Sequence, residues 1–258
     1  RSTPVIVNYR GGEARDYLQR SARWIKPSLA KAACVVVPSG FLEQVFAEYD
    51  IPTTIIPNII DLDTFRPALH SGAGVREQFT LVITRNLEPI YGLETAIACV
   101  AKLKEKIPGV VLKIAGSGPQ LSDLQKLALN LDVADQVVFL GRLDRPDIVA
   151  LYQAGDMMLN PSLVDNMPNS VLEALACGLP VVSTDVGGVP FIVKNGETAM
   201  LVPPQNADAM AAAVVRLHGD TAIRERLRSA GLGMVQRFTW PVVRQQWLSV
   251  YASASAAA

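Results

Sequence analysis

From residue 165 to residue 182 the chain reads DNMPNSVLEALACGLPVV, and two acids in it, Asp165 and Glu173, lie on either side of a helix start. Pro168 suits the first turn of a helix, where its missing N–H is no loss. An apolar stripe at helical spacing follows at Val171, Leu172 and Leu175. Gly178 then ends the helix. The spacing therefore predicts a loop at Asp165 and places Glu173 on the second helical turn.

The start of this helix suits an anionic ligand. The N–H groups of Asn169 and Ser170 have no partner inside a helix that begins here, and they lie at the positive end of its dipole. Such a terminus can hold a phosphate group. Glu173, beyond it, could meet a ribose, and Asp165, before it, could meet a sugar. Acids in the first turns of helices are also common because the dipole favours them, so the spacing alone leaves both interpretations open.

The rest of the chain alternates short apolar runs with amphipathic helices, which is typical of an α/β fold with parallel sheets. In the first part we expect strands over residues 4–8, 34–37 and 53–58. A helix over residues 13–33 should break or kink at Pro27. In the second part we expect strands over residues 79–84, 110–115, 137–140, 157–160, 180–183 and 199–202. Two helices capped by Asn206 and Asp220 follow these strands.

Polar and glycine-rich loops follow the strands of the second part. They contain Arg85, Gly116 to Gly118, Gly141 with Arg142, residues 165–170 and residues 184–188. Ligands of open α/β sheets bind beyond the carboxyl ends of the strands, so these loops predict one binding cleft. Gly116 and Gly118 would let the backbone approach a ligand closely. They do not complete a dinucleotide fingerprint, because Leu121 occupies the third glycine position, and a tight turn explains them about as well.

The segment 165–182, together with the STDVGGVP that follows it, resembles the Glu-x7-Glu signature of retaining GT-B glycosyltransferases of family 4. Asp165 stands here for the commoner glutamate. The resemblance covers essentially the whole chain. It implies that a hexosyl group is transferred from a UDP-, GDP- or ADP-sugar with retention of the anomeric configuration, without a metal or another cofactor. It also implies that Glu173 binds the ribose, that Asp165 lies near the sugar hydroxyls, and that the amides of Asn169 and Ser170 meet the phosphates.

The family pattern also identifies a phosphate loop. TRNLEPIYG, residues 84–92, resembles the Gly-Arg-Leu-x-Pro-x-Lys-Gly loop whose Arg and Lys hold the pyrophosphate. Arg85 matches that arginine and would stabilise charge on the departing diphosphate. Tyr91 replaces the lysine, so Arg142 is a candidate substitute. We therefore expect Asp165, Glu173 and Arg85 to be catalytic, and the donor-binding residues to be Arg85, Gly116, Gly118, Arg142, Asn166, Asn169, Ser170 and Glu173.

Two further features of the sequence, an acidic motif and the histidines, bear on the chemistry of the site. Asp61-Leu62-Asp63 matches the Asp-x-Asp metal motif of another glycosyltransferase fold. Because it begins the linker that ends at Arg66-Pro67, and is not a strand-end pair beside a nucleotide, we predict no metal there. GT-B enzymes usually place a histidine of the first domain near the donor sugar, and neither His70 nor His218 is positioned for this.

Composition limits the partners. The 258 residues carry 24 basic and 24 acidic side chains, so the net charge gives no reason to expect nucleic acid. Three dispersed cysteines, Cys34, Cys99 and Cys177, are typical of core thiols in a reducing compartment, and we expect a cytoplasmic protein. The basic residues between positions 10 and 31 could contact the inner face of an anionic membrane, where lipid-linked acceptors reside, although a solvated helix face also explains them.

Three parts are expected along the chain. Residues 1–66 would form the last β-α-β-α-β part of an acceptor domain with its linker, and residues 67–238 a complete Rossmann-like donor domain, with residues 68–74 as a boundary loop. Residues 239–258 would form a helix that packs back on the first domain, as in GT-B proteins. Its stripe of Trp240, Val243, Trp247, Val250 and Tyr251 is typical of core packing.

The chain starts at Arg1, close to its first strand, so we expect a fragment that lacks the first part of the acceptor domain. Such a piece should bind a nucleotide sugar but transfer it poorly to a sugar or lipid-linked acceptor. One alternative is a non-catalytic nucleotide-sugar-binding module. Another is a GT-B relative such as a starch-type synthase or a sugar-nucleotide epimerase, of which the paired acids make the epimerase less favoured.

Overall fold

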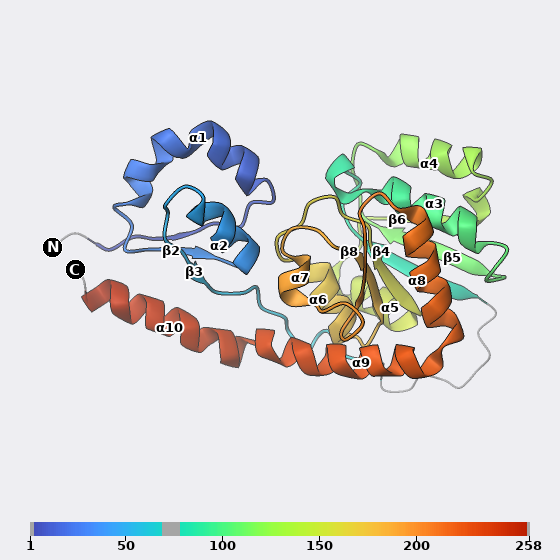
Figure 1. Ribbon diagram of the computed structural model, residues 1–258. Helices are drawn as coiled ribbons and strands as arrows, with labels where there is room; N and C mark the ends of the chain where they lie inside the picture. Colours follow the sequence, from blue (N-terminus) through green and yellow to red (C-terminus); the bar gives the residue numbers. More distant parts are fainter. Residues whose placement is uncertain (1–2, 69–77, 257–258) are drawn as a thin grey trace.

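The computed structural model describes residues 3–68 and 78–256 and contains two parallel sheets (Figure 1). The smaller sheet consists of β1 (Ile6–Asn8), β2 (Cys34–Val37) and β3 (Thr54–Ile55), in the order β1-β2-β3. The larger sheet consists of β4 (Phe79–Thr84), β5 (Val110–Ala115), β6 (Val137–Gly141), β7 (Met157–Asn160), β8 (Val181–Thr184) and β9 (Met200–Val202), in the order β6-β5-β4-β7-β8-β9. The predicted α/β class with parallel sheets is confirmed.

The smaller sheet is covered on both faces by segments from opposite ends of the sequence. On one face α1 (Ala14–Leu29) and α2 (Gly40–Ala47) pack against Val35 and Val37. On the other face α10 (Trp240–Ala256) buries Val243 against Val36 and Ile56. Figure 1 shows α1 and α10 on opposite sides of this sheet. The period of two along β2 explains this division, because successive side chains point to opposite faces.

Only part of the stripe on α10 lies in the core. Val243 is buried, and Trp247 and Val250 pack beside it, as predicted. Trp240 and Tyr251 are 50% and 54% exposed, so their assignment to the core is wrong. The sheet is the physical reason: three strands about 5 Å apart are too narrow to cover a helix of 17 residues from end to end.

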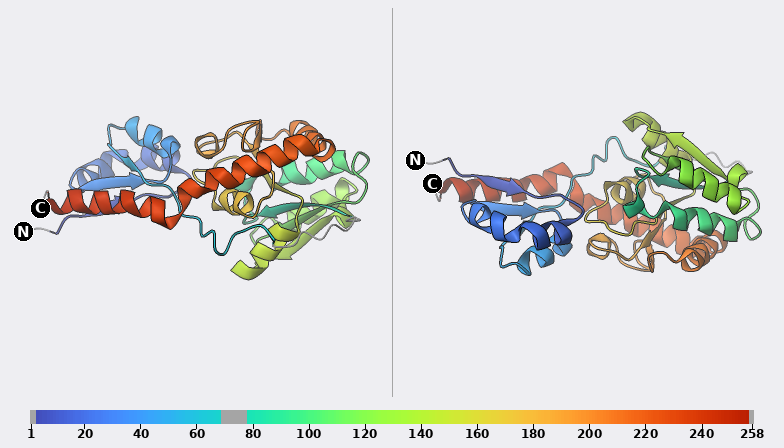
Figure 2. Two further views of the ribbon diagram at one scale, coloured as in Figure 1. Left: turned by 90° about the horizontal axis from the view of Figure 1, so that it is seen from below. Right: turned by 90° about the horizontal axis from the view of Figure 1, so that it is seen from above.

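The larger sheet carries helices on both faces. α3 (Leu93–Leu103), α4 (Leu121–Asn130) and α8 (Ala207–Gly219) pack on the face that contains Leu81 and Ile83. α5 (Arg145–Ala154), α6 (Asn169–Ala176) and the short α7 (Val189–Ile192) pack on the face that contains Val82 and Met158. α9 (Thr221–Val235) lies against α6 and leads through a 3-10 turn, Gln236–Phe238, into α10 (Figure 2). The result is a doubly wound domain from which α9 and α10 return to the smaller sheet.

Some element boundaries differ from the predictions. α1 ends at Leu29 instead of residue 33 and is not broken at Pro27, which lies in its last turn. β3 spans two residues instead of the predicted six. The caps at Asn206 and Asp220 are confirmed, since their side chains accept from the N–H groups of Ala209 and Ile223, both at 2.9 Å. No helix in the described ranges combines the length and the apolar character needed to cross a membrane.

The segment that follows β3 packs on the outside of the larger unit before the chain continues into β4. Ile60 and Phe65 are buried among residues of α5 and α6, and the Ile60 N–H donates to the Phe238 carbonyl at 2.9 Å. Most of the predicted boundary loop 68–74, His70 included, lies outside the described residues. The division at residues 66/67 and 238/239 therefore stays a prediction.

Candidate functional site

The strand order of the larger sheet places one crevice between β4 and β7. β5 and β6 lie on one side of β4, and β7, the next strand in the chain, lies on its other side. The loops that leave β4 and β7 diverge at such a switch point, which is where open α/β sheets bind ligands. Arg85 directly follows β4, and Asn160 ends β7.

A cavity of about 600 Å³ opens at this position. Seven residues of the predicted site line it: Arg85, Gly116, Arg142, Asp165, Asn169, Ser170 and Glu173. The structure thus brings together side chains and loops that are separated by up to 88 positions, as expected from the strand ends. Gly118 and Asn166, which were also predicted to bind the donor, are not among the residues that line it.

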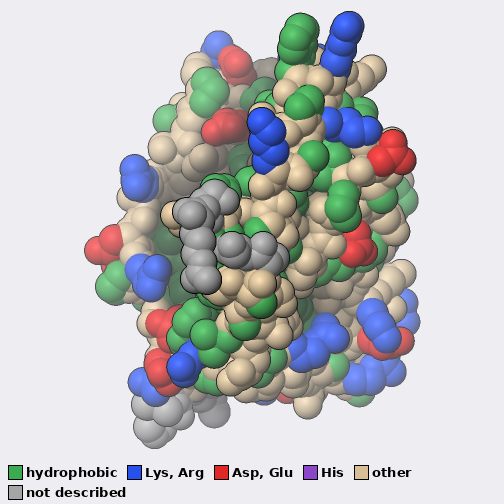
Figure 3. Space-filling view, turned by 90° about the vertical axis from the view of Figure 1, so that its left-hand side faces the viewer, with side chains coloured by type: hydrophobic (Ala, Val, Ile, Leu, Met, Phe, Trp, Pro, Cys, Tyr) green, Lys and Arg blue, Asp and Glu red, His purple; other side chains and the backbone are tan. Residues whose placement is uncertain are grey.

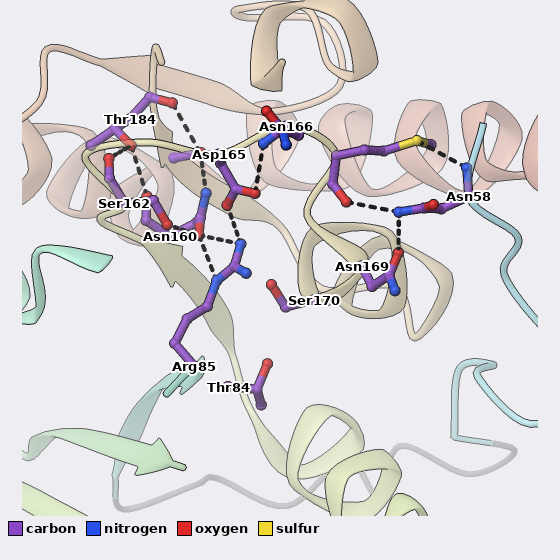
Figure 4. A network of polar contacts seen from close by, with 12 residues as sticks. Asn58, Thr84, Arg85, Asn160, Ser162, Asp165, Asn166, Asn169, Ser170 and Thr184 are labelled. Atoms are coloured by element: carbon purple, nitrogen blue, oxygen red, sulfur yellow. Dashed lines mark hydrogen bonds and ion pairs between the residues drawn. The ribbon is translucent and has the colours of Figure 1, made fainter. Parts of the chain in front are cut away.

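The Arg85 guanidinium is held on the β7 side of the cavity (Figure 4). Its Nε and Nη2 donate to Asn160 Oδ1 at 3.2 and 3.1 Å, and Nη2 also pairs with Asp165 Oδ2. The two charged side chains are only 12% and 10% exposed. Within the described chain Nη1 has no hydrogen bond, so it can serve a ligand in the cavity.

Polar residues at the ends of β7 and β8 hold this pair in place. Asn160 Nδ2 donates to Ser183 Oγ at 2.9 Å, and Ser162 Oγ donates to Asn160 Oδ1 at 3.0 Å. The Thr184 hydroxyl donates to the Ser162 carbonyl at 2.6 Å. These residues are buried, and only Thr184 belongs to a loop that was predicted to form the cleft. A polar residue that ends an apolar strand, as in MMLN at residues 157–160, is the signal that could have found Asn160.

Asp165 is a buried carboxylate with opposing influences on its ionisation. Burial raises its pKa, and the nearby Arg85 charge acts in the opposite direction without cancelling the effect. Its Oδ1 accepts from the Asn166 N–H at 3.0 Å, and its carbonyl accepts from the Gly188 N–H at 2.8 Å. A Cβ on Gly188 would lie 1.5 Å from the Asn166 carbonyl oxygen, so only glycine lets these two loops meet.

The N-terminus of α6 presents unpaired donors to the cavity. Pro168 is the N-cap residue, directly before the first helical residue Asn169, and it supplies no side-chain cap. The first N–H of the helix with a backbone partner is that of Val171, which reaches the Pro168 carbonyl at 3.2 Å. In the described structure the N–H groups of Asn169 and Ser170 have no partner, and the buried Ser170 Oγ has none either. An orphaned buried hydroxyl is costly unless a ligand satisfies it.

Glu173 lies deeper along the same helix and is held by a tyrosine. The hydroxyl of Tyr152 lies 3.3 Å from Glu173 Oε2 and 3.2 Å from the Ser170 carbonyl, both acceptors for its one proton, and it also contacts the Thr84 hydroxyl. Burial raises the pKa of Glu173, while the Tyr152 hydrogen bond lowers it less strongly. Tyr152 itself is fully buried, which raises its pKa well above the usual value. No pattern in the sequence marks Tyr152.

The other candidates have structural surroundings of their own. A Cβ on Gly116 would lie 1.8 Å from the Arg85 carbonyl oxygen, and one on Gly118 would lie 2.4 Å from that of Leu87, so these glycines let two loops pack together. Arg142 is exposed at the cavity rim. The Asp61 carboxylate accepts from the Thr64 hydroxyl at 2.6 Å and from two backbone N–H groups, which makes it part of a turn.

The ring of Tyr91 packs against Arg85, with the guanidinium carbon 5.0 Å from its centroid. His218 lies far from the cavity, because it packs at 4.6 Å on Phe79, at the opposite end of β4. A second cavity, of about 1110 Å³, lies between residues 9–21 of the smaller unit and residues 88–91. Tyr91 lines both cavities.

The two parallel sheets, with a last helix that returns to the first of them, define the GT-B class of glycosyltransferase fold. Residues 70–234, more than half of the chain, match the family described as glycosyl transferases group 1. The chain belongs to this family, as the resemblance of its paired acids implied.

Relatives of known sequence agree with this assignment. The chain is 32% identical over 205 residues to a GDP-mannose-dependent alpha-(1-6)-phosphatidylinositol monomannoside mannosyltransferase of Mycolicibacterium smegmatis, covering 74% of this chain and 52% of that one. It is 30% identical over 211 residues to a D-inositol 3-phosphate glycosyltransferase of Kribbella flavida, covering 76% and 50%. The chain thus spans about half the length of these relatives.

Solved structures show the same fold. Sucrose-phosphate synthase from Thermosynechococcus elongatus superposes with a TM-score of 0.83 at 28% identity, over 98% of this chain and 68% of that one. Anabaena HepE in complex with UDP superposes with a TM-score of 0.85 at 21% identity, over 97% and 72%. The second likeness concerns the fold alone.

Proposed function

We propose that the whole protein is a retaining glycosyltransferase that takes a hexosyl group from a nucleoside-diphosphate sugar, and that the cavity beside α6 is its donor site. The observation that carries this proposal is the buried Ser170 Oγ without a hydrogen-bond partner among the described residues, beside two unpaired N–H groups and the free Nη1 of Arg85. All are donors, and all line one cavity. A diphosphate is an acceptor that would satisfy them together.

In this proposal the donors act most strongly as the reaction proceeds. When the bond between the anomeric carbon and the phosphate oxygen breaks, negative charge grows on the departing nucleoside diphosphate. Arg85 and the α6 N-terminus are already in place in a partly buried cavity, so they stabilise that charge without reorganising. Glu173, oriented by Tyr152, would accept hydrogen bonds from the ribose, and Asp165 would lie near the sugar hydroxyls. No step in this scheme requires a metal.

The experiment is calorimetric titration of the wild type and of Ser170→Ala with UDP, GDP and ADP. We expect one diphosphate to bind the wild type and to bind Ser170→Ala roughly ten-fold more weakly. The variant should keep or increase the free energy of unfolding, because it removes an unsatisfied buried group. Ser122→Ala, at an exposed position of α4, is the matched control. Binding of no diphosphate by the wild type, or equal binding by Ser170→Ala, would contradict the proposal.

The second cavity is the proposed place for the acceptor. It adjoins the donor cavity through Tyr91, and it is lined by aromatic and polar groups from both units, among them Tyr9, Tyr17, Arg20 and Glu88. Aromatic faces with hydroxyl groups suit a sugar or the polar head of a lipid-linked acceptor. Two relatives are named for phosphatidylinositol monomannoside and inositol 3-phosphate. Saturation-transfer NMR with inositol phosphates in the presence of the bound diphosphate tests this assignment.

We further propose that the protein acts at the cytoplasmic face of an anionic membrane, with α1 as the contact. Trp24 on α1 is 75% exposed, with the Arg23 guanidinium 5.7 Å from its ring, and Arg20 and Lys31 are also exposed. Figure 3 shows the end of the molecule at the left of Figure 1, where apolar, basic and acidic side chains all reach the surface. Aromatic and basic groups together favour an anionic lipid surface. Three free thiols support a reducing compartment.

Vesicle co-sedimentation measures this contact. We expect phosphatidylserine-containing vesicles to retain the protein and pure phosphatidylcholine vesicles to release it. Trp24→Ala should weaken retention, whereas Trp240→Ala, which removes another exposed tryptophan, should not. Equal behaviour of the two variants would favour a solvated helix face instead.

A non-catalytic binding module is the second candidate, and the observation that favours it is Tyr91, an uncharged ring that packs against the Arg85 guanidinium. Donor turnover in the full-length protein separates the two. Diphosphate binding without hydrolysis of the donor or transfer to an acceptor would favour the module.

A further inference from the structure

The Arg85 guanidinium is enclosed from two sides by groups of different kinds. Asn160 and Asp165 hold its edge through hydrogen bonds and an ion pair, and these consume Nε and Nη2. The ring of Tyr91 packs against the guanidinium, 5.0 Å from ring centroid to guanidinium carbon. Hydrogen bonds fix the plane of a guanidinium, and an aromatic ring restricts motion out of that plane. Together they leave Nη1 as the free donor.

The backbone fixes the position of this ring. Tyr91 ends a 3-10 turn, Pro89–Tyr91, in which its N–H donates to the Glu88 carbonyl at 3.0 Å. The Leu163 N–H donates to the Ile90 carbonyl at 2.8 Å, which ties the turn to the segment after β7. Gly92 follows with a φ of 57°, and a Cβ there would lie 2.5 Å from the Pro161 carbonyl oxygen. The turn that carries the Tyr91 ring is therefore held against the loop that precedes Asp165.

The contact between Tyr91 and Arg85 is important for anion binding because few cationic side chains line the cavity. Arg85 and Arg142 are the cations among the described residues that line it, and Arg142 is exposed at the rim. A diphosphate in the cavity would therefore depend largely on one guanidinium. A flexible guanidinium would lose orientation entropy when it binds, and a ring that holds it in advance reduces this loss.

We propose that Tyr91 is a positioning residue that holds the Arg85 guanidinium for the diphosphate of the donor. This inference rests on the proposed donor site and deepens it. Tyr91 contributes its aromatic face, and its hydroxyl group is not required. The contact stabilises the bound diphosphate without adding a charge, and it has no part in recognising the nucleoside.

The test compares Tyr91→Phe, Tyr91→Leu and Tyr91→Met with the wild type. Calorimetry measures affinities for UDP, GDP and inorganic pyrophosphate, and ligand-observed NMR measures those for uridine and guanosine. We expect Tyr91→Phe to bind the diphosphate like the wild type. Tyr91→Leu and Tyr91→Met should bind it about 5- to 30-fold more weakly, with nucleoside affinity unchanged. Two apolar replacements are used so that a folding defect in one of them does not decide the result.

Each other outcome overturns the inference. Unchanged diphosphate affinity in Tyr91→Leu and Tyr91→Met would leave the donor site intact but remove the role of the ring. An equal loss for the nucleoside would mean that Tyr91 supports the cavity as a whole, and a loss in Tyr91→Phe would assign the effect to the hydroxyl. If the wild type binds neither a nucleoside diphosphate nor pyrophosphate, both the proposed function and this inference are wrong.

Discussion

The side-chain amide of Asn58 donates a hydrogen bond to Asn169 Oδ1 at 2.9 Å, although the two residues belong to different units of the fold. Asn58 follows β3 of the smaller sheet, and Asn169 is the first residue of α6. The same amide donates to the Met167 carbonyl at 3.1 Å. The connecting segment is therefore bonded to the loop and helix terminus that line the cavity between β4 and β7.

Replacing Asn58 by Ala should weaken this connection. Loss of two hydrogen bonds should lower the free energy of unfolding by about 1–2 kcal/mol, and it should also weaken diphosphate binding because Asn169 loses its orientation. Urea denaturation and calorimetry measure the two effects. Asn130→Ala, at the exposed end of α4, is the control and should change neither. Diphosphate affinity that is identical in Asn58→Ala and the wild type would disprove the link to the cavity.

Glu173→Gln should weaken nucleotide binding strongly. If the carboxylate accepts two charge-assisted hydrogen bonds from the ribose, its loss should cost roughly 2–3 kcal/mol, about 30- to 150-fold in affinity. Calorimetry with the nucleoside diphosphate that binds the wild type measures this. Glu105→Gln, at an exposed position, is the control. Unchanged affinity in a folded Glu173→Gln protein would refute the ribose role.

The buried carboxyl of Glu173 should also leave a signature in the pH dependence of stability. Burial raises its pKa above the ordinary value of 4.5, so the folded protein holds the proton more tightly than the unfolded chain. The resulting stabilisation is complete below pH 4.5 and is lost as the pH rises through the folded-state pKa. The free energy of unfolding of the wild type should therefore fall relative to that of Glu173→Gln as the pH rises from about 4 to 7. Parallel pH profiles of the two proteins would show that the shift is absent.

Chelation of metal ions should not affect donor binding. Arg85 and the α6 N-terminus are the groups proposed to neutralise the diphosphate, so treatment with EDTA should leave calorimetric affinities unchanged. Asp61→Asn should behave like the wild type, because that carboxylate is engaged with Thr64 in a turn. A requirement for Mg²⁺ or Mn²⁺ would instead restore Asp61-Leu62-Asp63 as a candidate metal site.

The sequence was sufficient to predict the features that follow from local patterns of residues. The strands follow from apolar runs, and one cleft beyond their carboxyl ends follows from parallel-sheet geometry, which brings Arg85 and Asp165 to one edge. Tyr152 and its bond to Glu173 could not be predicted, because a tyrosine on the buried face of a helix looks like core packing. The close approach at Gly118 could not be predicted for a related reason, since the carbonyl that this glycine accommodates belongs to Leu87 in a distant loop.

The predicted end of β3 and part of the predicted core were also wrong, because they depend on contacts with residues that are distant in the sequence. β3 pairs with β2 over two residues, although its sequence could continue as a strand to residue 58. The segment instead leaves the sheet, and Asn58 turns toward α6. Trp240 and Tyr251 were assigned to the core by helical spacing, but spacing does not reveal how wide the opposing sheet is.

The placement of α10 delays the folding of the smaller sheet during synthesis. Val36 and Ile56 leave the ribosome before the larger domain is made, but Val243, which covers them, leaves it only after that domain. At typical translation speeds, about 10–40 s pass before α10 is available to cover the face of the smaller sheet that contains Val36 and Ile56. During that time the larger domain can fold completely while a hydrophobic surface beside it stays bare. A ribosome that stalls before residue 243 therefore holds a chain whose smaller sheet is a natural client for chaperones.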